Sequence, residues 1–318
     1  MRSLLDHPLH GRIALAGLLA LAALPLVMQQ LDQPFYVVLA SRILIFALVA
    51  TSLNLVVGFG GMVCFGHAAF FGAGAYVVAI LMVHGVSSAW ISWPAAVAVA
   101  SGAALLIGAI SLRTRGVYFI MITLAFAQMV YYIFVSLKVY GGEDGLPMPG
   151  RSQVGLGLNL KSDITFYYVV LALFSMAFFF TARLVNSRFG RVLQGIRENE
   201  TRMEAAGYPV YRFKLIAFVL AGALAGLGGA LLANQNQLAS PTMLHWTQSG
   251  ILLIMVILGG VGYLYGGLLG AAVLLLLEEL ISSHTIHWQL GVGLVLLAVV
   301  LFAPNGLSTL LRRGRAGG

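Results

Sequence analysis

Long apolar stretches separated by short polar segments run along almost the whole chain. An α-helix needs about 20 apolar residues to cross the hydrocarbon core of a membrane, and most of the stretches approach that length. The pattern therefore predicts about ten transmembrane helices. Their approximate bounds are 13–31, 35–57, 65–83, 89–112, 117–137, 164–182, 213–233, 246–258, 264–280 and 288–302.

The first apolar stretch admits two interpretations. Arg12 followed by residues 13–31 resembles the basic and apolar regions of a secretory signal peptide. About 19 apolar residues are long for such a peptide, however, and no clear small-residue cleavage site follows them. We predict a retained first transmembrane helix.

Composition supports a membrane bundle and excludes a soluble domain. Apolar residues make up 60% of the 318 positions and charged residues only 9%, whereas a soluble domain of this length needs far more polar surface. The prediction is an all-α, polytopic transmembrane bundle that forms one domain over residues 1–318. The single cysteine, Cys64, excludes a disulfide framework within the chain.

Basic residues determine the predicted orientation, because cytoplasmic loops carry an excess of Lys and Arg. An even number of helices places both termini on one side, and we predict that this side is cytoplasmic. Only Lys138, Arg151 and Lys161 then lie outside, and Arg42 lies within a helix near its outer end. The basic residues on the inner side are Arg2, Arg12, Arg113, Arg115, Arg183, Arg188, Arg191, Arg197, Arg202, Arg212, Lys214, Arg312, Arg313 and Arg315.

The chain lacks the residues with which it could power transport itself. None of its lysines follows a glycine, so no phosphate-binding P-loop can form. Acidic residues lie almost entirely in predicted loops, whereas ion-coupled carriers usually keep ionisable groups deep in the membrane. We expect neither enzymatic activity nor a metal or cofactor in this chain. A stand-alone secondary transporter or channel is the alternative, and an intramembrane enzyme is a remote one.

Glycines gather in two segments, residues 53–76 and 259–270, which together hold 12 of the 38 glycines. One interpretation is close helix packing alone. The other is that these segments are also unwound parts of a translocation pathway, in corresponding positions of two halves. The candidate pathway residues are Asn54, Gly58, Gly61, His67, Tyr118, Thr123, Gly259 and Gly260. For the polar ones among them, hydrogen bonding between helices is the alternative role.

One polar segment, residues 183–212, is large enough to hold structure of its own. Apolar residues recur in it at helical spacing, Ser187 can cap the start of a helix, and Gly207 can end one. A short amphipathic helix outside the membrane suits docking into a groove of a partner protein. An arginine-held helix lying on anionic lipid fits the composition equally well.

Several motifs resemble one family, in order, over residues 42–307. They are SLNLVVGFGGMVCFGHAAFFGAGAY at 52–76, RTRGVYFIMITLAF at 113–126, FGRVLQGIRENE at 189–200, KLIAFVLAGALAGLGGALLA at 214–233, SPTMLHWTQSGILLIMVILGGVGYLYGGLLGAAVLLLLEE at 240–279 and LFAPNGL at 301–307. With these motifs the chain resembles the LivM-type permease subunits of branched-chain amino acid ABC transporters.

The resemblance implies a type II-like importer fold of about ten helices in the bacterial inner membrane. It implies four partners: a homologous LivH-type permease, two cytoplasmic ATPase subunits that bind ATP and Mg, and a periplasmic solute-binding protein. Residues 183–212 become the ATPase-coupling loop, and residues 139–163 become an external loop. The resemblance assigns Ile196, Arg197, Glu198, Asn199, Glu200 and Gly207 to ATPase coupling, and Gly141, Gly142 and Gly145 to docking of the binding protein.

Two departures from the family pattern concern these loops. Arg202 and Met203 stand where relatives usually place two small residues, and the external loop reads YGGEDGL, with an acidic pair that relatives do not usually carry. The departures leave the detail of ATPase docking and the identity of the receptor open. The solute is likewise open between branched-chain or related amino acids and the urea, amides or aromatic acids that similar permeases carry.

Overall fold

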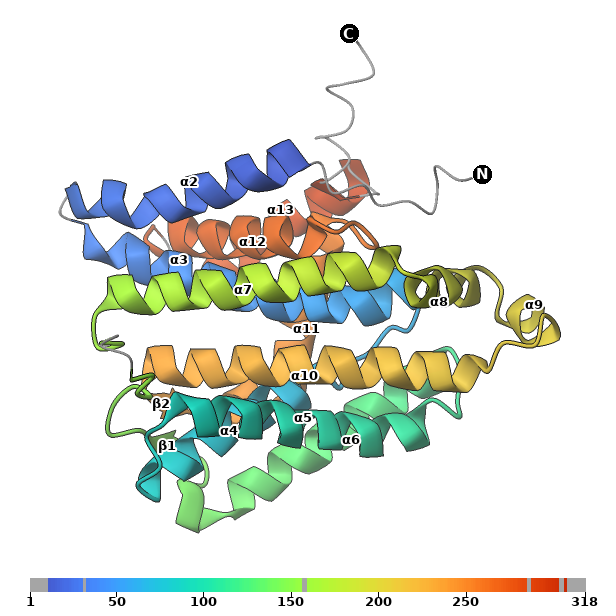
Figure 1. Ribbon diagram of the computed structural model, residues 1–318, viewed down its shortest axis with the longest axis horizontal. Coiled ribbons are helices and arrows are strands. Elements are labelled where there is room, and N and C mark those ends of the chain that lie inside the picture. Colours follow the sequence, from blue (N-terminus) through green and yellow to red (C-terminus); the bar gives the residue numbers. More distant parts are fainter. Residues whose placement is uncertain (1–10, 31–32, 156–158, 285–286, 303–305, 308–318) are drawn as a thin grey trace, which may run out of the picture.

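The computed structural model describes residues 11–30, 33–155, 159–284, 287–302 and 306–307. Helices dominate it, and the only paired strands within these residues are two short ones (Figure 1). The elements are α2 (Gly11–Gln30), α3 (Pro34–Asn54), the π-helix η1 (Leu55–Phe59), α4 (His67–Val83), α5 (Ala89–Ser111), α6 (Val117–Ser136), the 3-10 helix η2 (Lys138–Tyr140), β1 (Leu146–Pro147), α7 (Asp163–Asn186), α8 (Arg188–Glu198), α9 (Glu200–Ala205), α10 (Val210–Asn236), β2 (Leu238–Ala239), the 3-10 helix η3 (Pro241–Met243), α11 (Trp246–Gly259), α12 (Gly266–Ser282) and α13 (Trp288–Phe302).

Each apolar stretch of the sequence forms a helix with bounds close to those predicted. By length and composition, five helices within the described residues are long and apolar enough to cross a membrane: α3 with η1, α5, α6, α7 and α10. The helices α4 and α11 and the segment Ala16–Gln30 of α2 are shorter but also apolar. The chain is thus an all-α membrane protein. The prediction that both termini are cytoplasmic concerns residues 1–10 and 308–318, which lie outside the described part.

Helix α3 forms the centre of the bundle. Its apolar residues cover the whole circumference, as is typical of a helix buried on all sides, and it packs against α7, α10, α11 and α12. Because α3 has no polar face, Ser41, Ser52 and Asn54 on it are buried along with the apolar residues.

Small residues let α10 approach α4 and α5 closely. A methyl group placed at Gly74 of α4 would lie 2.1 Å from the carbonyl oxygen of Gly226 in α10, and one at Gly222 would lie 2.4 Å from Ala104 in α5. The sequence motif around Gly222 to Gly229 is therefore used for helix packing, as small residues are in other membrane bundles.

The bundle has two distinct ends. At one end lie α8, α9 and the turn between α5 and α6; at the other lie β1, β2 and the loop after α6 (Figure 1). We call them the α9 end and the β end. The pairing of Leu146 with Ala239 holds the loop before α7 against the turn after α10. The two ends differ in their basic residues: the basic segment 183–214 lies at the α9 end, whereas only Lys138, Arg151 and Lys161, beside the acidic Glu143, Asp144 and Asp163, lie in the loops of the β end.

Two interruptions of helical structure lie near the α9 end. Helix α11 has 14 residues, about 21 Å of rise, and ends before the break at residues 260–265, after which α12 returns toward the β end. Helix α3 likewise ends in η1 and the loop 60–66, and α4 returns from there. Both glycine-rich segments of the sequence therefore contain a real interruption of helical structure.

Candidate functional site

Asn54 joins the two glycine-rich segments. Its side-chain Nδ2 donates a hydrogen bond to the carbonyl of Tyr263 (2.8 Å), and its Oδ1 accepts one from the backbone N–H of Gly262 (2.9 Å). Asn54 is the last residue of α3 and is buried. The Asn54 side chain thus pairs one backbone N–H and one backbone carbonyl of the segment between α11 and α12. Burying these two backbone groups without hydrogen-bond partners would be costly.

The contact between the two segments requires glycine on both sides. A methyl group at Gly58 would lie 2.5 Å from the backbone nitrogen of Gly262, closer than any real contact. Gly262 itself has a φ of 82°, in the left-handed region that glycine adopts without cost. The structure therefore brings Asn54 and Gly58 of the first segment against Gly262 of the second.

Helix α8 covers this contact from the α9 end. Ser187 caps α8 as predicted, accepting a hydrogen bond from Gly190. The apolar side of α8, with Leu193 and Ile196, is buried against α7, α10 and η1. Because this apolar side packs against other helices of the same chain, it is not exposed to lipid or to the groove of a partner protein.

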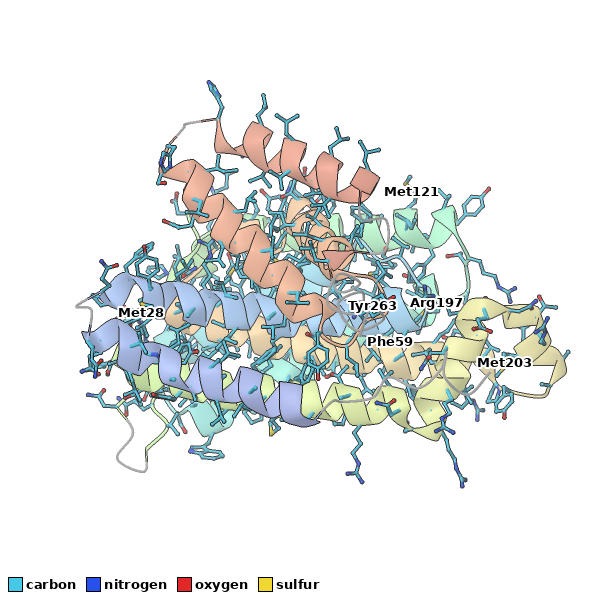
Figure 2. The ribbon with its side chains drawn as sticks, turned by 90° about the horizontal axis from the view of Figure 1, so that it is seen from above. Met28, Phe59, Met121, Arg197, Met203 and Tyr263 are labelled. Atoms are coloured by element: carbon cyan, nitrogen blue, oxygen red, sulfur yellow. The ribbon has the colours of Figure 1, made fainter. Side chains whose placement is uncertain are left out.

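Arg197 reaches from α8 into the joint between the two glycine segments. Its guanidinium donates a hydrogen bond to the carbonyl of Gly58. The aliphatic part of the side chain lies against Gly61, where an added methyl group would come within 2.8 Å of Arg197 Cγ. Figure 2 shows Arg197 beside Phe59 and Tyr263, with Met28 at the opposite end of the molecule.

Glu200, at the start of α9, is held between two basic residues. Lys214 Nζ of α10 lies 2.6 Å from Glu200 Oε2, and Arg115 Nη2 of the α5–α6 turn lies 3.3 Å from Glu200 Oε1. Arg115 also contacts Glu204, at 2.9 Å. Because the side chains of Lys214 and Glu200 are only 11% and 22% exposed, their pair is the least screened by solvent in this network.

The remaining coupling candidates form the exposed part of the loop. Asn199 caps α9 by accepting a hydrogen bond from Arg202 N–H (2.9 Å), and Gly207, with a φ of 84°, ends the turn after α9. Met203 folds back on Gly195 of α8, where a methyl group would lie 3.0 Å from its sulfur. Glu198 is exposed, as is almost all of 201–209.

His67 and Thr123 are buried but lie apart from the Arg197 contact. His67 Nε2 lies 2.8 Å from Ser52 Oγ, and His67 Nδ1 has no hydrogen-bond partner among the residues that the structure describes. Thr123 Oγ1 donates to the carbonyl of Ile120 and accepts from the N–H of Phe65, which fixes the loop before α4 to α6. Tyr118 is 76% exposed at the start of α6 and joins neither cluster.

Gly259 and Gly260 close the second break by backbone packing. A methyl group at Gly259 would lie 1.8 Å from the carbonyl oxygen of Gly266, so α11 and α12 touch directly there. Gly260 has a φ of 115° and lies against Gly306. Both glycines therefore shape the break that Asn54 holds.

At the β end, Gly141, Gly142 and Gly145 build a tight turn. All three have positive φ, and a methyl group at Gly141 would lie 2.0 Å from the carbonyl oxygen of Gly145. The turn presents Glu143 and Asp144, which are exposed. The glycines thus shape the loop, and the side chains available to a partner are acidic.

Sequence reasoning missed several residues of these clusters. Lys214 and Arg115 pair with Glu200, Gly262 receives Asn54, and Ser52 contacts His67. Gly262 lies in the glycine-rich segment 259–270, but the sequence does not show that this glycine, with its positive φ, is the one that contacts Asn54. Among the described residues no group of three or more His, Cys, Asp or Glu is placed to hold a metal ion.

A bundle of long apolar helices, with two helix interruptions joined at one end and an amphipathic helix seated on the joint, defines an all-α membrane protein. The family model described as branched-chain amino acid transport system / permease component matches residues 35–303. The chain belongs to this family.

Named relatives agree with this membership. The chain is 29% identical to the high-affinity branched-chain amino acid transport system permease protein LivM of Escherichia coli K12, over 86% of this chain and 70% of the relative. It is 27% identical to a probable LivM of Methanocaldococcus jannaschii, over 67% of each chain. It is 25% identical to the Escherichia coli K12 permease protein LivH, over 82% of this chain and 90% of LivH. No solved structure matches the chain significantly.

Proposed function

We propose that the chain is the permease subunit of an ABC importer that moves branched-chain or related amino acids into the cell. The observation that carries the proposal is the family match over residues 35–303, together with relatives named as branched-chain amino acid transport permeases. The sparsely charged bundle fits a neutral zwitterionic solute that crosses without being held tightly.

The proposed topology has ten membrane crossings, with the α9 end in the cytoplasm of a bacterial inner membrane. The clustering of basic residues at that end supports it, because Lys and Arg are enriched on the cytoplasmic side. Both termini would then be cytoplasmic, and the β end, with residues 139–163, would face the periplasm.

Four partners complete the proposed importer: a LivH-type permease, two cytoplasmic ATPase subunits and a periplasmic solute-binding protein. The exposed residues 201–209 are the surface of the coupling loop available to an ATPase. The acidic turn with Glu143 and Asp144 is available to the binding protein. ATP and Mg act in the ATPase subunits, and this chain supplies the moving bundle for alternating access.

The experiment that tests this proposal is uptake of radiolabelled leucine by vesicles containing the purified complex. We expect uptake that requires ATP and the binding protein, with urea, short amides and aromatic acids as competitors to define the solute class. Accumulation by this chain alone, driven by an ion gradient without ATP, would identify a secondary transporter and refute the proposal.

A further inference from the structure

We propose that Arg197 is a positioning residue that latches the two glycine-broken segments together and transmits motion of α8 to them. The inference rests on the proposed function, because it assigns a role within ATP-driven transport. It differs from the expected role of Arg197 as a contact with the ATPase, since its guanidinium donates to Gly58 of the same chain.

The first step is the bond that Arg197 makes. Its guanidinium donates to the carbonyl of Gly58, which lies in the last turn of η1. Carbonyls in the last turn of a helix lack their usual intrahelical donor. A charged donor therefore satisfies Gly58 more strongly than a neutral one would.

The second step is the fit of Arg197 between the two segments. On one side its stem lies against Gly61, and on the other its Nη1 would be 2.9 Å from a methyl group placed at Gly262. Both glycines have positive φ, 68° and 82°, so neither position tolerates a side chain. The side chain thus contacts backbone of both segments, although Arg197 as a whole residue remains exposed.

The third step is the connection beyond Gly58. Asn54 lies one turn before Gly58 and binds both Gly262 and Tyr263. Displacing the end of η1 therefore strains the bonds that hold the second break. Arg197 and Asn54 together form one chain of contacts, which we call the inner latch, from α8 to the α11–α12 turn.

The fourth step is the link to the exposed part of the loop. Only Asn199 separates α8 from α9, and the residues from 201 to 209 are almost all exposed. A partner that moves α9 pulls α8 and withdraws Arg197 from Gly58. The structure shows the latch closed, and its release frees both broken segments in the same movement.

The native Cys64 reports on the latch without any partner. Cys64 is the only cysteine of the chain, is fully buried, and lies in the loop that follows Gly61. We expect Arg197→Ala to raise the rate of maleimide labelling of Cys64 in the solubilised chain about tenfold or more, since a charge-assisted bond is lost. Arg188→Ala is the matched control, because Arg188 is likewise an exposed arginine of α8 but lies at the opposite end of that helix from Arg197. Unchanged labelling in Arg197→Ala, or an equal rise in the control, overturns the latch.

The reconstituted complex supplies the second readout, which is the ratio of uptake to ATP hydrolysis. We expect Arg197→Ala to copurify with the ATPases and hydrolyse ATP while uptake falls about tenfold or more. Arg197→Lys should restore part of the uptake, since it keeps the charge but not the planar fork. Loss of ATPase copurification would make Arg197 a docking residue and refute the proposal.

A third variant covers the case in which Arg197→Ala fails to fold. Arg197→Met keeps the apolar stem against Gly61 but removes the charged donor, and we expect it to raise Cys64 labelling and lower coupling in the same way. Normal labelling in Arg197→Met refutes the latch. Failure of the wild-type complex to transport with ATP refutes the proposed function instead, and the labelling result is independent of it.

Discussion

Glu200, which the resemblance assigned to ATPase coupling, forms ion pairs within its own chain. Its carboxylate lies between Lys214 and Arg115, which belong to different parts of the α9 end. The pair with Lys214 is mostly shielded from solvent, so loss of either charge leaves the other poorly compensated. Glu200 therefore fixes the position of α9 relative to α10.

We predict that Glu200→Gln destabilises the protein by about 1–3 kcal/mol, the range for leaving a charged group without its partner. Thermal unfolding of the purified chain in detergent measures the effect. Glu198→Gln is the matched control, because Glu198 is exposed two residues away and should change stability by less than about 0.5 kcal/mol. Equal stability of the two variants would show that the Lys214 pair contributes nothing.

The helical structure of the coupling loop could be predicted from the sequence, but the directions in which its side chains point could not. The spacing of Ile196 with other apolar residues predicted an amphipathic helix, which α8 is. The pattern could not tell whether its apolar side faces lipid, a partner or the chain itself, because each removes that side from water. Likewise, nothing in the sequence shows that Arg197 points toward Gly58, since that contact joins residues 139 positions apart.

At the scale of the helices, α4 and α10 approach each other so closely that only glycine fits between them. Besides the contact of Gly74 with Gly226, a methyl group at Gly229 would lie 1.7 Å from the carbonyl oxygen of Phe71. Backbone atoms cannot rotate aside as a flexible side chain can. The distance between α4 and α10 is therefore set by the absence of side chains at these positions.

We predict that Gly74→Ala destabilises the bundle by about 1–3 kcal/mol, the usual cost of overpacking a well-packed core. Gly102→Ala in α5 is the control: nothing lies within 4 Å of its added methyl group, and helix propensity favours alanine by up to about 1 kcal/mol. Chemical unfolding of both variants in detergent gives the comparison. Equal loss in both would mean that crowding against α10 is not the cause.

The elements most accurately predicted were the apolar helices, because a long apolar run has few stable alternatives in a membrane. The division of the loop 183–212 into α8 and α9 was less visible. It depends on Asn199, which ends one helix and caps the next. The π-helix η1 and the pairing of β1 with β2 had no local signal, since both depend on residues distant in sequence.

At the scale of the whole molecule, the charged residues are divided between the two ends while the bundle between them is nearly uncharged. The α9 end carries Arg202 on an exposed helix, and the β end carries Asp144 on an exposed turn. One helix, α7, crosses the bundle between the two positions. This division of charge is the basis of the proposed orientation, in which the basic end faces the cytoplasm.

We predict that Asp144→Cys reacts with a membrane-impermeant maleimide in intact spheroplasts, whereas Arg202→Cys reacts only in inverted vesicles. The native Cys64 gives little background because it is buried. Since both positions lie in exposed segments, a difference in labelling reports sidedness rather than burial. Labelling of both cysteines from the same side would show that α7 does not cross the membrane. Labelling with the sides exchanged would place the coupling loop in the periplasm, where no ATP-driven partner could reach it.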